Sequence, residues 1–452
     1  MISTRLAFLL VSFSLGQLGD GLNIFQGIYL VGVGWEEGAV GTALSLMGLT
    51  SLMMQPFAGN WVDTTTIDRR WFLVLASIIT ACSASTILFV HPTQLNHALI
   101  YISKFVEGIA SSFIIPCLAA LTMASFGPTQ FDEVMASNIY WGHVGSVAAA
   151  VLAGIVAVVS FPHVEYSFLV IGGSALVAII FVPYLPQGNP LWGRGLDTSS
   201  PTDSDTEAGN SHSEDSGDYE IPMETTPLAP SNSTRDDTPQ VASYWQVLTE
   251  YKTLILCVTG FFYQYVFYCV VIVFYCIVIE FYWFECYIVS FSHSSLSSFA
   301  NANVLLVLGE IMGQGGEEQV GLTRYAIPLT AGAIVTAQFF MAVATYVAGE
   351  YTEKGWGRKP LFLIGIVSLP IRCALIILLK DAGHQYLVAT QILDGVGGGL
   401  FGVIHPFIVA DITFGTGRFN AVSKCCTSAL VVESVLQEDY NLTYFSVLSQ
   451  WA

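Results

Sequence analysis

Residues 97–124 read HALIYISKFVEGIASSFIIPCLAALTMA, and this stretch decides the kind of fold that the chain can adopt. Lys104 and Glu107 are its only acidic or basic residues, histidine aside. As an α-helix the stretch would be about 42 Å long, enough to cross a hydrocarbon core of roughly 30 Å. Because backbone groups in lipid must bond within their own segment, we predict a membrane-spanning helix here.

Similar apolar runs recur along the chain of 452 residues, of which 53% are apolar and only 11% charged. Soluble domains carry roughly a quarter charged residues, so about half of the usual charge is missing. The runs do not show the alternating ten-residue pattern of a β-barrel. We therefore predict an all-α, multi-pass integral membrane protein. The ten predicted spans are residues 6–33, 38–58, 71–90, 97–124, 136–160, 166–185, 253–280, 325–348, 360–379 and 385–412.

The Lys and Arg residues predict the orientation of these spans. If the N-terminus lies in the cytosol, 11 of the 15 basic residues fall in cytosolic segments. Of the other four basic residues, Arg324 and Lys380 fall on the opposite side, and Lys104 and Arg372 fall within spans. An excess of basic residues marks the cytosolic side of a membrane protein, so we predict a cytosolic N-terminus.

An acidic segment divides the chain. Residues 197–237 contain 11 carboxylates and one basic residue, Arg235, and account for much of the net charge of −19. Such a segment, rich in Ser, Thr and Pro, cannot bury enough apolar surface to order itself. We predict four parts: a six-helix half at 1–185, a disordered cytosolic linker at 186–252, a second half at 253–415 and an atypical tail at 416–452.

Two motifs repeat across the linker at nearly the same offset. Gly59 and Asp63 follow the second span, and Gly349 and Glu353 follow the eighth span, 290 residues later. Glu107 with its glycine neighbour lies in the fourth span, and Asp394 with its glycine neighbour lies in the tenth, 287 residues later. Two separate motifs with almost one offset indicate an internal repeat. Basic residues accompany the first motif in both copies: Arg69 and Arg70, then Lys354, Arg358 and Lys359.

These motifs resemble the signature of the major facilitator superfamily (MFS), a Gly-x-x-x-Asp turn with basic residues between spans 2 and 3 that recurs between spans 8 and 9. The resemblance covers residues 1–420 and implies two pseudo-symmetric helical bundles that transport a solute by alternating access. It also implies that Asp63, near helix N-termini, and the basic residues latch the halves on the cytosolic side. The chain departs from the signature at Thr64, which replaces a basic residue, and at Lys104, where the family has an arginine.

The family has twelve spans, whereas ten are visible in this sequence. No apolar run of 20 residues follows Asn420, where the eleventh span should begin. We expect spans 11 and 12 to be missing, either because the chain is a C-terminally truncated or mis-spliced product or because it is a naturally short member.

Polar residues inside spans are the candidates for chemistry, because a charge in mid-bilayer costs at least about 2.5–3.5 kcal/mol. In the first span, Asp20 lies near the middle with Gln17 and Asn23 beside it, either to bind a proton or solute or to hydrogen-bond a neighbouring helix. Gln264 in the seventh span lies among tyrosines that could line a cavity. The alternatives for His143 and His405 are proton transfer near neutral pH and simple packing. A run of glycines at 395–402 would let the tenth span slide on its neighbours.

Buried charges in the remaining spans predict ion pairs. Lys104 lies one turn before Glu107, so an intrahelical pair would reduce the cost of burying both, and a role in coupling is the alternative. Asp394 occupies the equivalent place in the repeat. We expect Arg372 in the ninth span to pair with Asp411 near the end of the tenth, mainly for structural reasons.

These features favour a secondary active transporter of a small solute, a symporter or antiporter coupled to protons and working as a monomer in the bilayer. The alternatives are a membrane receptor or sensor that has kept the transporter fold, or a non-functional truncated product. Because the sequence contains no nucleophile–base set, Walker motif or zinc-type spacing, we expect no enzymatic activity, cofactor, metal or nucleic-acid partner.

Overall fold

The computed structural model describes residues 3–18, 25–27, 29–30, 33, 35–90, 97–196, 242–243, 246–247, 250, 253, 326–354, 357–379 and 384–424. Every regular element in these ranges is a helix, which confirms the predicted all-α class. The α-helices are α1 (Thr4–Leu18), α3 (Glu37–Thr64), α4 (Arg69–Ser85), α5 (His97–Ser160), α6 (Leu169–Phe181), α10 (Ala326–Glu353), α11 (Arg358–Leu379), α12 (His384–Ala389) and α13 (Gln391–Thr413). The 3-10 helices are η1 (Thr86–Phe89), η2 (Val164–Phe168), η3 (Val182–Tyr184) and η4 (Trp192–Arg194), and residues 419–424 are also helical.

Within the part of the chain that the structure describes, five helical segments are long and apolar enough to cross a membrane by their length and composition. They are Arg69–Phe89, His97–Ser160, Val164–Tyr184, Ala331–Thr352 and Gln391–Thr413. The helices coincide with nine of the ten predicted spans, the first of them in part. Residues 254–280 of the predicted seventh span, with Gln264, and residues 19–24 of the first span, with Asp20 and Asn23, lie outside the described residues.

Helix α5 contains two predicted spans joined by a sharp bend. Gly127 has φ 72° and ψ 173°, a conformation that favours glycine, and Pro128 follows it. The Asn138 side chain donates a hydrogen bond to the Thr122 hydroxyl, 16 residues earlier, at 2.9 Å. A straight helix would separate these two residues by about 24 Å. The two arms of α5 therefore fold back on each other as a hairpin of spans.

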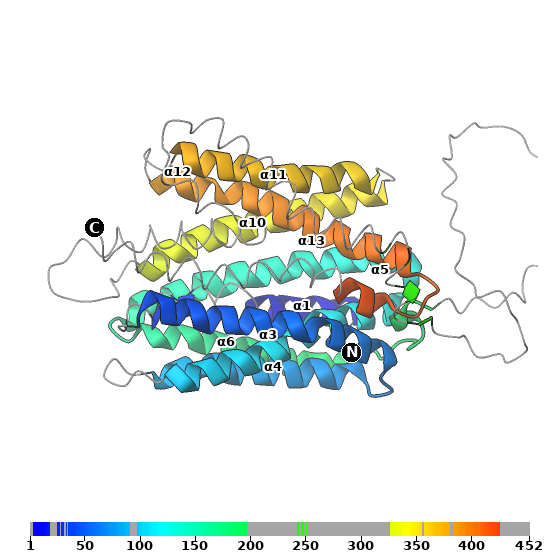
Figure 1. The fold of residues 1–452 in the computed structure, drawn as a ribbon, viewed down its shortest axis with the longest axis horizontal. Helices are drawn as coiled ribbons and strands as arrows, with labels where there is room; N and C mark the ends of the chain where they lie inside the picture. Colours follow the sequence, from blue (N-terminus) through cyan, green and yellow to red (C-terminus); the bar gives the residue numbers. More distant parts are fainter. Residues whose placement is uncertain are drawn as a thin grey trace, which may run out of the picture.

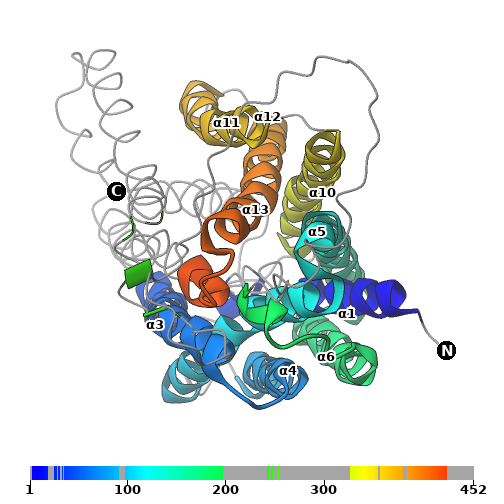
Figure 2. The same cartoon turned by 90° about the vertical axis from the view of Figure 1, so that its right-hand side faces the viewer.

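The helices form two groups that lie side by side (Figure 1). Helices α1 and α3–α6, blue to green, make one group, and α10, α11 and α13, yellow to orange, make the other; the end-on view of Figure 2 shows α5 next to α10. A buried apolar cluster joins the groups through Phe131 and Met135 of α5, Ala348 of α10 and Phe407 of α13. We call the groups the N-terminal and the C-terminal half.

The internal repeat is visible in how the two halves pack. A Cβ on Gly108 of α5 would lie 2.4 Å from the backbone oxygen of Met47 in α3. A Cβ on Gly395 of α13 would lie 2.5 Å from the backbone oxygen of Ala337 in α10. Gly108 and Gly395 are 287 residues apart, and Met47 and Ala337 are 290 residues apart. These are the two offsets of the sequence motifs. Each half therefore packs its repeat-equivalent helices through the same close glycine contact, as expected of two pseudo-symmetric bundles.

The two loops that carry the repeated motif lie at the same end of the molecule. The rings of Phe131, at the start of the second arm of α5, and Phe419, after α13, meet edge to face at 5.4 Å. The residues that follow them, Asp132 and Asn420, contact the motif residues Arg358 and Asp63. Five arginines with contacts in this region mark what we call the basic end: Arg5, Arg69, Arg194, Arg358 and Arg418. The prediction that this end faces the cytosol stays a prediction.

The described start of the predicted linker, residues 186–196, packs at the basic end. The backbone N–H of Asn189 donates to the carbonyl of Ala124 in α5 at 2.8 Å. The carbonyl of Gly195 accepts a hydrogen bond from the N–H of Gly415, after α13, at 2.6 Å. This segment therefore contacts both halves, and the acidic stretch at 197–237 lies outside the described residues.

Candidate functional site

Asp63, at the end of α3, forms the polar centre of one contact between the halves. Its Oδ1 accepts hydrogen bonds from the Asn420 side chain at 2.7 Å and the Asn420 backbone N–H at 3.3 Å. Its Oδ2 accepts from the backbone N–H of Ala421 at 2.8 Å. The helix at 419–424 thus begins on a carboxylate that satisfies its free N–H groups, a favourable place for negative charge. We call this contact the first latch.

The environment of Asp63 changes its affinity for protons. Burial raises the pKa of Asp63 to about 7, although the hydrogen bonds from Asn420 and Ala421 and the charge of Arg69 act to lower it. Gly59, one turn earlier in α3, permits the close approach, since a Cβ there would lie 2.4 Å from the Asn420 carbonyl oxygen. The motif residues Gly59 and Asp63 therefore lie on one face of α3 and act together.

Arg69 and Arg70, the basic residues of the first motif, join the start of α4 to the segment that follows α6. Arg69 Nη2 donates to the Pro190 carbonyl at 3.4 Å, and Arg70 Nη1 donates to the Leu185 carbonyl at 2.9 Å. Arg70 also pairs with Asp68, the N-cap of α4, at 2.6 Å. None of these contacts crosses to the C-terminal half.

Arg358, at the start of α11, makes the second contact between the halves. Its guanidinium pairs with Asp132 of α5 through Nη2 and with Asp411 of α13 through Nη1. It also donates to the Phe407 carbonyl at 3.1 Å and lies over the Phe407 ring. We call the contact of Arg358 with Asp132 and Asp411 the second latch.

The other residues of the second motif have local roles where they are described. Lys354 pairs with Glu350 one turn earlier at 3.1 Å. Gly349 faces α5, and a Cβ on it would lie 3.2 Å from the Cβ of Ala136. Glu353 ends α10 and Lys359 follows Arg358 in α11, but their side chains lie outside the described part.

The predicted pair between Arg372 and Asp411 is wrong. Arg372 pairs with Asp394 at 2.6 Å, and both side chains are buried, whereas Asp411 pairs with Arg358. Asp394 and Asp411 are 17 residues apart, so α13 separates them by about 25 Å. Asp411 therefore lies at the basic end beside the first residue of α11, while Asp394 lies level with Arg372, deeper in the half.

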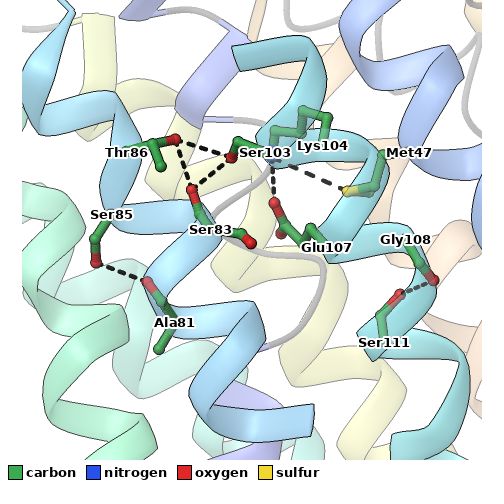
Figure 3. Close-up of polar contacts among 10 residues, drawn as sticks. All are labelled: Met47, Ala81, Ser83, Ser85, Thr86, Ser103, Lys104, Glu107, Gly108 and Ser111. Atoms are coloured by element: carbon green, nitrogen blue, oxygen red, sulfur yellow. Dashed lines mark hydrogen bonds and ion pairs between the residues drawn. The ribbon is translucent and has the colours of Figure 1, made fainter. Parts of the chain in front are cut away.

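Lys104 and Glu107 form a buried ion pair within α5. The Lys104 Nζ lies 2.8 Å from Glu107 Oε2, and the two side chains are only 2% and 4% exposed. Residues three apart share a helix face, and the structure confirms the predicted intrahelical pair. Figure 3 shows the pair beside Met47 of α3, whose sulfur lies 4.0 Å from the Lys104 nitrogen.

Hydroxyl groups link the start of α5 to the end of α4 next to this pair (Figure 3). The Thr86 hydroxyl donates to the Ser103 hydroxyl at 2.8 Å, and Ser103 donates to the Ser83 carbonyl at 2.7 Å. Ser103 precedes Lys104, so the network fixes the turn of α5 that carries the buried cation.

The two candidate histidines have different surroundings. His143 Nδ1 lies 2.7 Å from the Gln338 side-chain oxygen, a hydrogen bond between α5 and α10 and thus between the halves. His405 is buried in α13, and its ring stacks on Phe401 with a 25° angle between the planes. Gln17 accepts a hydrogen bond from Ser174, which joins α1 to α6 within the N-terminal half. These contacts place His143 between the halves, and the predicted alternatives of chemistry and packing stay open for His143, His405 and Gln17.

The residues that contact across the halves and were missed by the sequence analysis include Asp132, Gln338 and Asn420. A signal for two of them is present. Gly127 and Phe131 recur as Gly415 and Phe419 at an offset of 288 residues, and both glycines have positive φ, 72° and 81°. The residues that follow the phenylalanines are Asp132 and Asn420, so a third repeated motif marks the partner of each latch.

The described residues contain no group of three or more His, Cys, Asp or Glu side chains that could hold a metal ion. Their side chains make polar contacts and ion pairs, some between the halves and some inside each half.

This arrangement defines a class of protein: an α-helical membrane protein of two repeated halves that polar contacts hold together at one end. Its residues 6–326 match the family model of the Major Facilitator Superfamily, and the chain belongs to that superfamily. It is thus a multi-pass integral membrane protein of a transporter family.

Similar proteins agree with this family. Two uncharacterized MFS-type transporters of Mycobacterium tuberculosis, from strains CDC 1551 / Oshkosh and ATCC 25618 / H37Rv, are 28% identical to the chain over 428 residues, 94% of this chain and 83% of each relative. The crystal structures of the nucleoside transporter NupG and of a single-site mutant of it share the fold, with a TM-score of 0.51 and 13% identity. They match 99% of this chain, over 97% of NupG and 98% of the mutant.

Proposed function

We propose that the protein is a secondary active transporter that carries a small solute by alternating access and is driven by protons. Family membership supports transport. The observation that carries the mechanism is the pair of latches at the basic end. Each latch joins a residue of a repeated motif to the other half through a few polar contacts, and contacts with water can replace these when the latch opens.

The second latch is suited to opening because it is partly hydrated. The side chains of Arg358, Asp132 and Asp411 are 25%, 28% and 52% exposed. We propose that the basic end faces the cytosol, as the basic residues predict. Closed latches would then seal the cytosolic entrance, and their opening would give the solute access from that side.

Proton drive requires a carboxylate that gains and loses a proton inside the membrane. Asp20, Glu107 and Asp394 are the candidates, because they are acidic residues of the predicted spans, where a charge is costly. Lys104 pairs with Glu107 and Arg372 pairs with Asp394 in the described conformation.

The test is uptake into proteoliposomes that contain the purified protein. The vesicles are incubated with a cell extract and with uridine, the latter because NupG transports nucleosides, and their contents are analysed by mass spectrometry. We expect at least one compound to accumulate when a pH gradient is imposed and not when a protonophore collapses it. Accumulation that is indifferent to the protonophore would contradict proton drive. No accumulation at all would favour a receptor or sensor with the transporter fold.

A further inference from the structure

The two buried ion pairs occupy equivalent places in the repeat. Glu107 and Asp394 are related by the 287-residue offset, and each precedes the glycine that packs on the neighbouring helix. Glu107 lies 2.8 Å from Lys104, and Asp394 lies 2.6 Å from Arg372. Each half therefore keeps one buried carboxylate at the same position of the repeat and pairs it with one buried cation.

The cations do not follow the repeat. Lys104 corresponds to Gln391 at the same offset of 287 residues. Arg372 corresponds to Ser83 at the offset of 289 residues that relates the starts of α4 and α11. The N-terminal half thus has its cation on the same helix as the carboxylate, whereas the C-terminal half has it on the neighbouring helix.

This difference decides which pair can separate. Lys104 and Glu107 are three residues apart in α5, so any movement of the helix carries both. Arg372 and Asp394 belong to α11 and α13, which meet through small residues: a Cβ on Gly397 would lie 2.4 Å from Ser368 Oγ. Small residues at a helix interface allow close approach and sliding. Sliding of α11 along α13 would separate Arg372 from Asp394.

Separation has unequal consequences for the two charges. A buried carboxylate that loses its cation can take up a proton and become neutral. A guanidinium stays charged at physiological pH, so Arg372 keeps its capacity to bind an anion. Among the described side chains, Arg372 of α11 pairs with Asp394, and Ala337, Phe340 and Met341 of α10 lie against the neighbouring Gly395.

We propose that Arg372 binds an anionic group of the transported solute, a carboxylate or a phosphate, in competition with Asp394. Uptake of one proton converts the Asp394 carboxylate to the neutral acid and releases Arg372 for the anion. The net charge of the occupied site equals that of the resting pair, so its burial adds no unpaired charge. Guanidinium and carboxylate or phosphate match in geometry as well as charge. The inference rests on the proposed transport function.

The experiment measures anion binding to the full chain, purified in detergent, by the rise of the thermal unfolding midpoint with ligand concentration. The probes are lactate, succinate and inorganic phosphate, with uridine as the neutral control. We expect at least one anion to bind more tightly as the pH falls, by up to about tenfold per pH unit for one linked proton. Stabilisation by none of the three anions at acidic pH would overturn the proposal, as would tight binding without any pH dependence.

Variants separate competition from a structural role. Asp394→Asn should bind the anion at least as tightly as the natural protein does at acidic pH, and without pH dependence, because the competitor is gone. Arg372→Gln should abolish binding. Arg372→Lys, which keeps the charge if the glutamine variant does not fold, should weaken binding and retain the pH dependence. Glu107→Gln is the matched variant in the Lys104–Glu107 pair. If anion binding lost its pH dependence in Glu107→Gln and kept it in Asp394→Asn, the assignment of the competing carboxylate to Asp394 would be overturned.

The outcome is distinguishable from failure of the proposed function. If the pH gradient drives no uptake but anion binding follows the pattern above, the site stands and proton-driven transport fails. If the gradient drives uptake but binding in Asp394→Asn remains proton-linked, transport stands and Arg372 is not the anion site.

Discussion

The two latches differ at the residue scale in the charge that each loop motif contributes. The end of α3 contributes an acid, Asp63, which binds the N-terminus of the helix at 419–424. The start of α11 contributes a base, Arg358, which binds two acids. Acidification therefore acts on the two contacts through different carboxyl groups, and the first latch can be tested alone.

The first latch should close more firmly as the pH falls. Burial raises the pKa of Asp63 to about 7 in the closed latch, whereas the exposed carboxyl of the open latch would titrate near 3.8. The closed state therefore binds the proton more tightly, and its advantage is lost as the pH rises toward about 7. We expect a cysteine introduced at the buried Ala421 to be labelled faster at neutral than at acidic pH, after correction for thiol reactivity.

Asp63→Asn is the control for this pH dependence. The amide does not titrate and places an NH2 group among N–H donors, which should weaken the latch by roughly 1–3 kcal/mol. Labelling should become faster at all pH values, with no remaining pH dependence beyond that of the reagent. An unchanged pH profile would mean that another group controls access.

Removing one partner of the Lys104–Glu107 ion pair should lower the free energy of unfolding more than removing both partners. Lys104→Met leaves Glu107 buried without this cation, and loss of one member of a buried pair costs about 3–5 kcal/mol. The double variant Lys104→Met/Glu107→Leu should recover most of the stability. Unfolding by denaturing detergent measures the difference. Arg5→Gln, which breaks an exposed pair with Glu133, should cost less than about 1 kcal/mol. Equal losses in all variants would contradict the argument.

The sequence predicted residue contacts where they are local. The Lys104–Glu107 pair follows from helical spacing alone. The partner of Arg372 depends on the register between α11 and α13, which are antiparallel, and neither helix encodes that register by itself. Asp132 was missed because an acid near a predicted loop has no visible cost until Arg358 is placed beside it.

At the scale of elements, the close glycine contacts should control how the helices pack. Gly395→Ala would place a Cβ 2.5 Å from the Ala337 carbonyl oxygen, and the backbones must move apart. We expect a loss of about 1–3 kcal/mol from this overpacking, measured by unfolding in detergent. Gly402→Ala on the same helix meets nothing within 4 Å and should be neutral or stabilising by about 0.5–1 kcal/mol. Similar effects of both substitutions would mean that helix propensity, not contact, dominates.

Most elements could be predicted because apolar length is a direct property of the sequence. The helices at 37–64, 69–85 and 326–353 extend the corresponding predictions by a few residues or start earlier, since apolar composition does not mark where a helix leaves the membrane. The two arms of the hairpin inside α5 were predicted as the spans 97–124 and 136–160. The tight bend between them was not predicted, because it depends on the positive φ of Gly127, which a glycine permits but does not require.

For the whole molecule, a disulfide between the halves should stop the cycle. Gly349 and Ala136 face each other from α10 and α5, and the Cβ atoms would be 3.2 Å apart. Slight adjustment gives the distance of about 3.5–4.5 Å that a disulfide needs. In a chain without its native cysteines, we expect Ala136→Cys/Gly349→Cys to oxidise, to block labelling of a cysteine at Ala421 and to abolish proton-driven uptake. A reductant should restore both.

Each single cysteine variant serves as the control and should behave as the parent does. Full uptake with the disulfide formed would show that α5 and α10 do not separate at the basic end. The halves would then have to move relative to each other without separating at the contact between α5 and α10.

The edge-to-face contact between Phe131 and Phe419 has a consequence for ancestry. By the internal repeat the two phenylalanines are the same residue counted twice, and a residue can touch its own equivalent only beside the axis that relates the copies. If the halves descend from one duplicated gene, this contact began as a single residue meeting itself, and one mutation would have changed both sides. Duplication freed the next position to differ: Asp132 now binds Arg358, and Asn420 binds Asp63. One symmetrical joint has thereby become two, each able to evolve on its own.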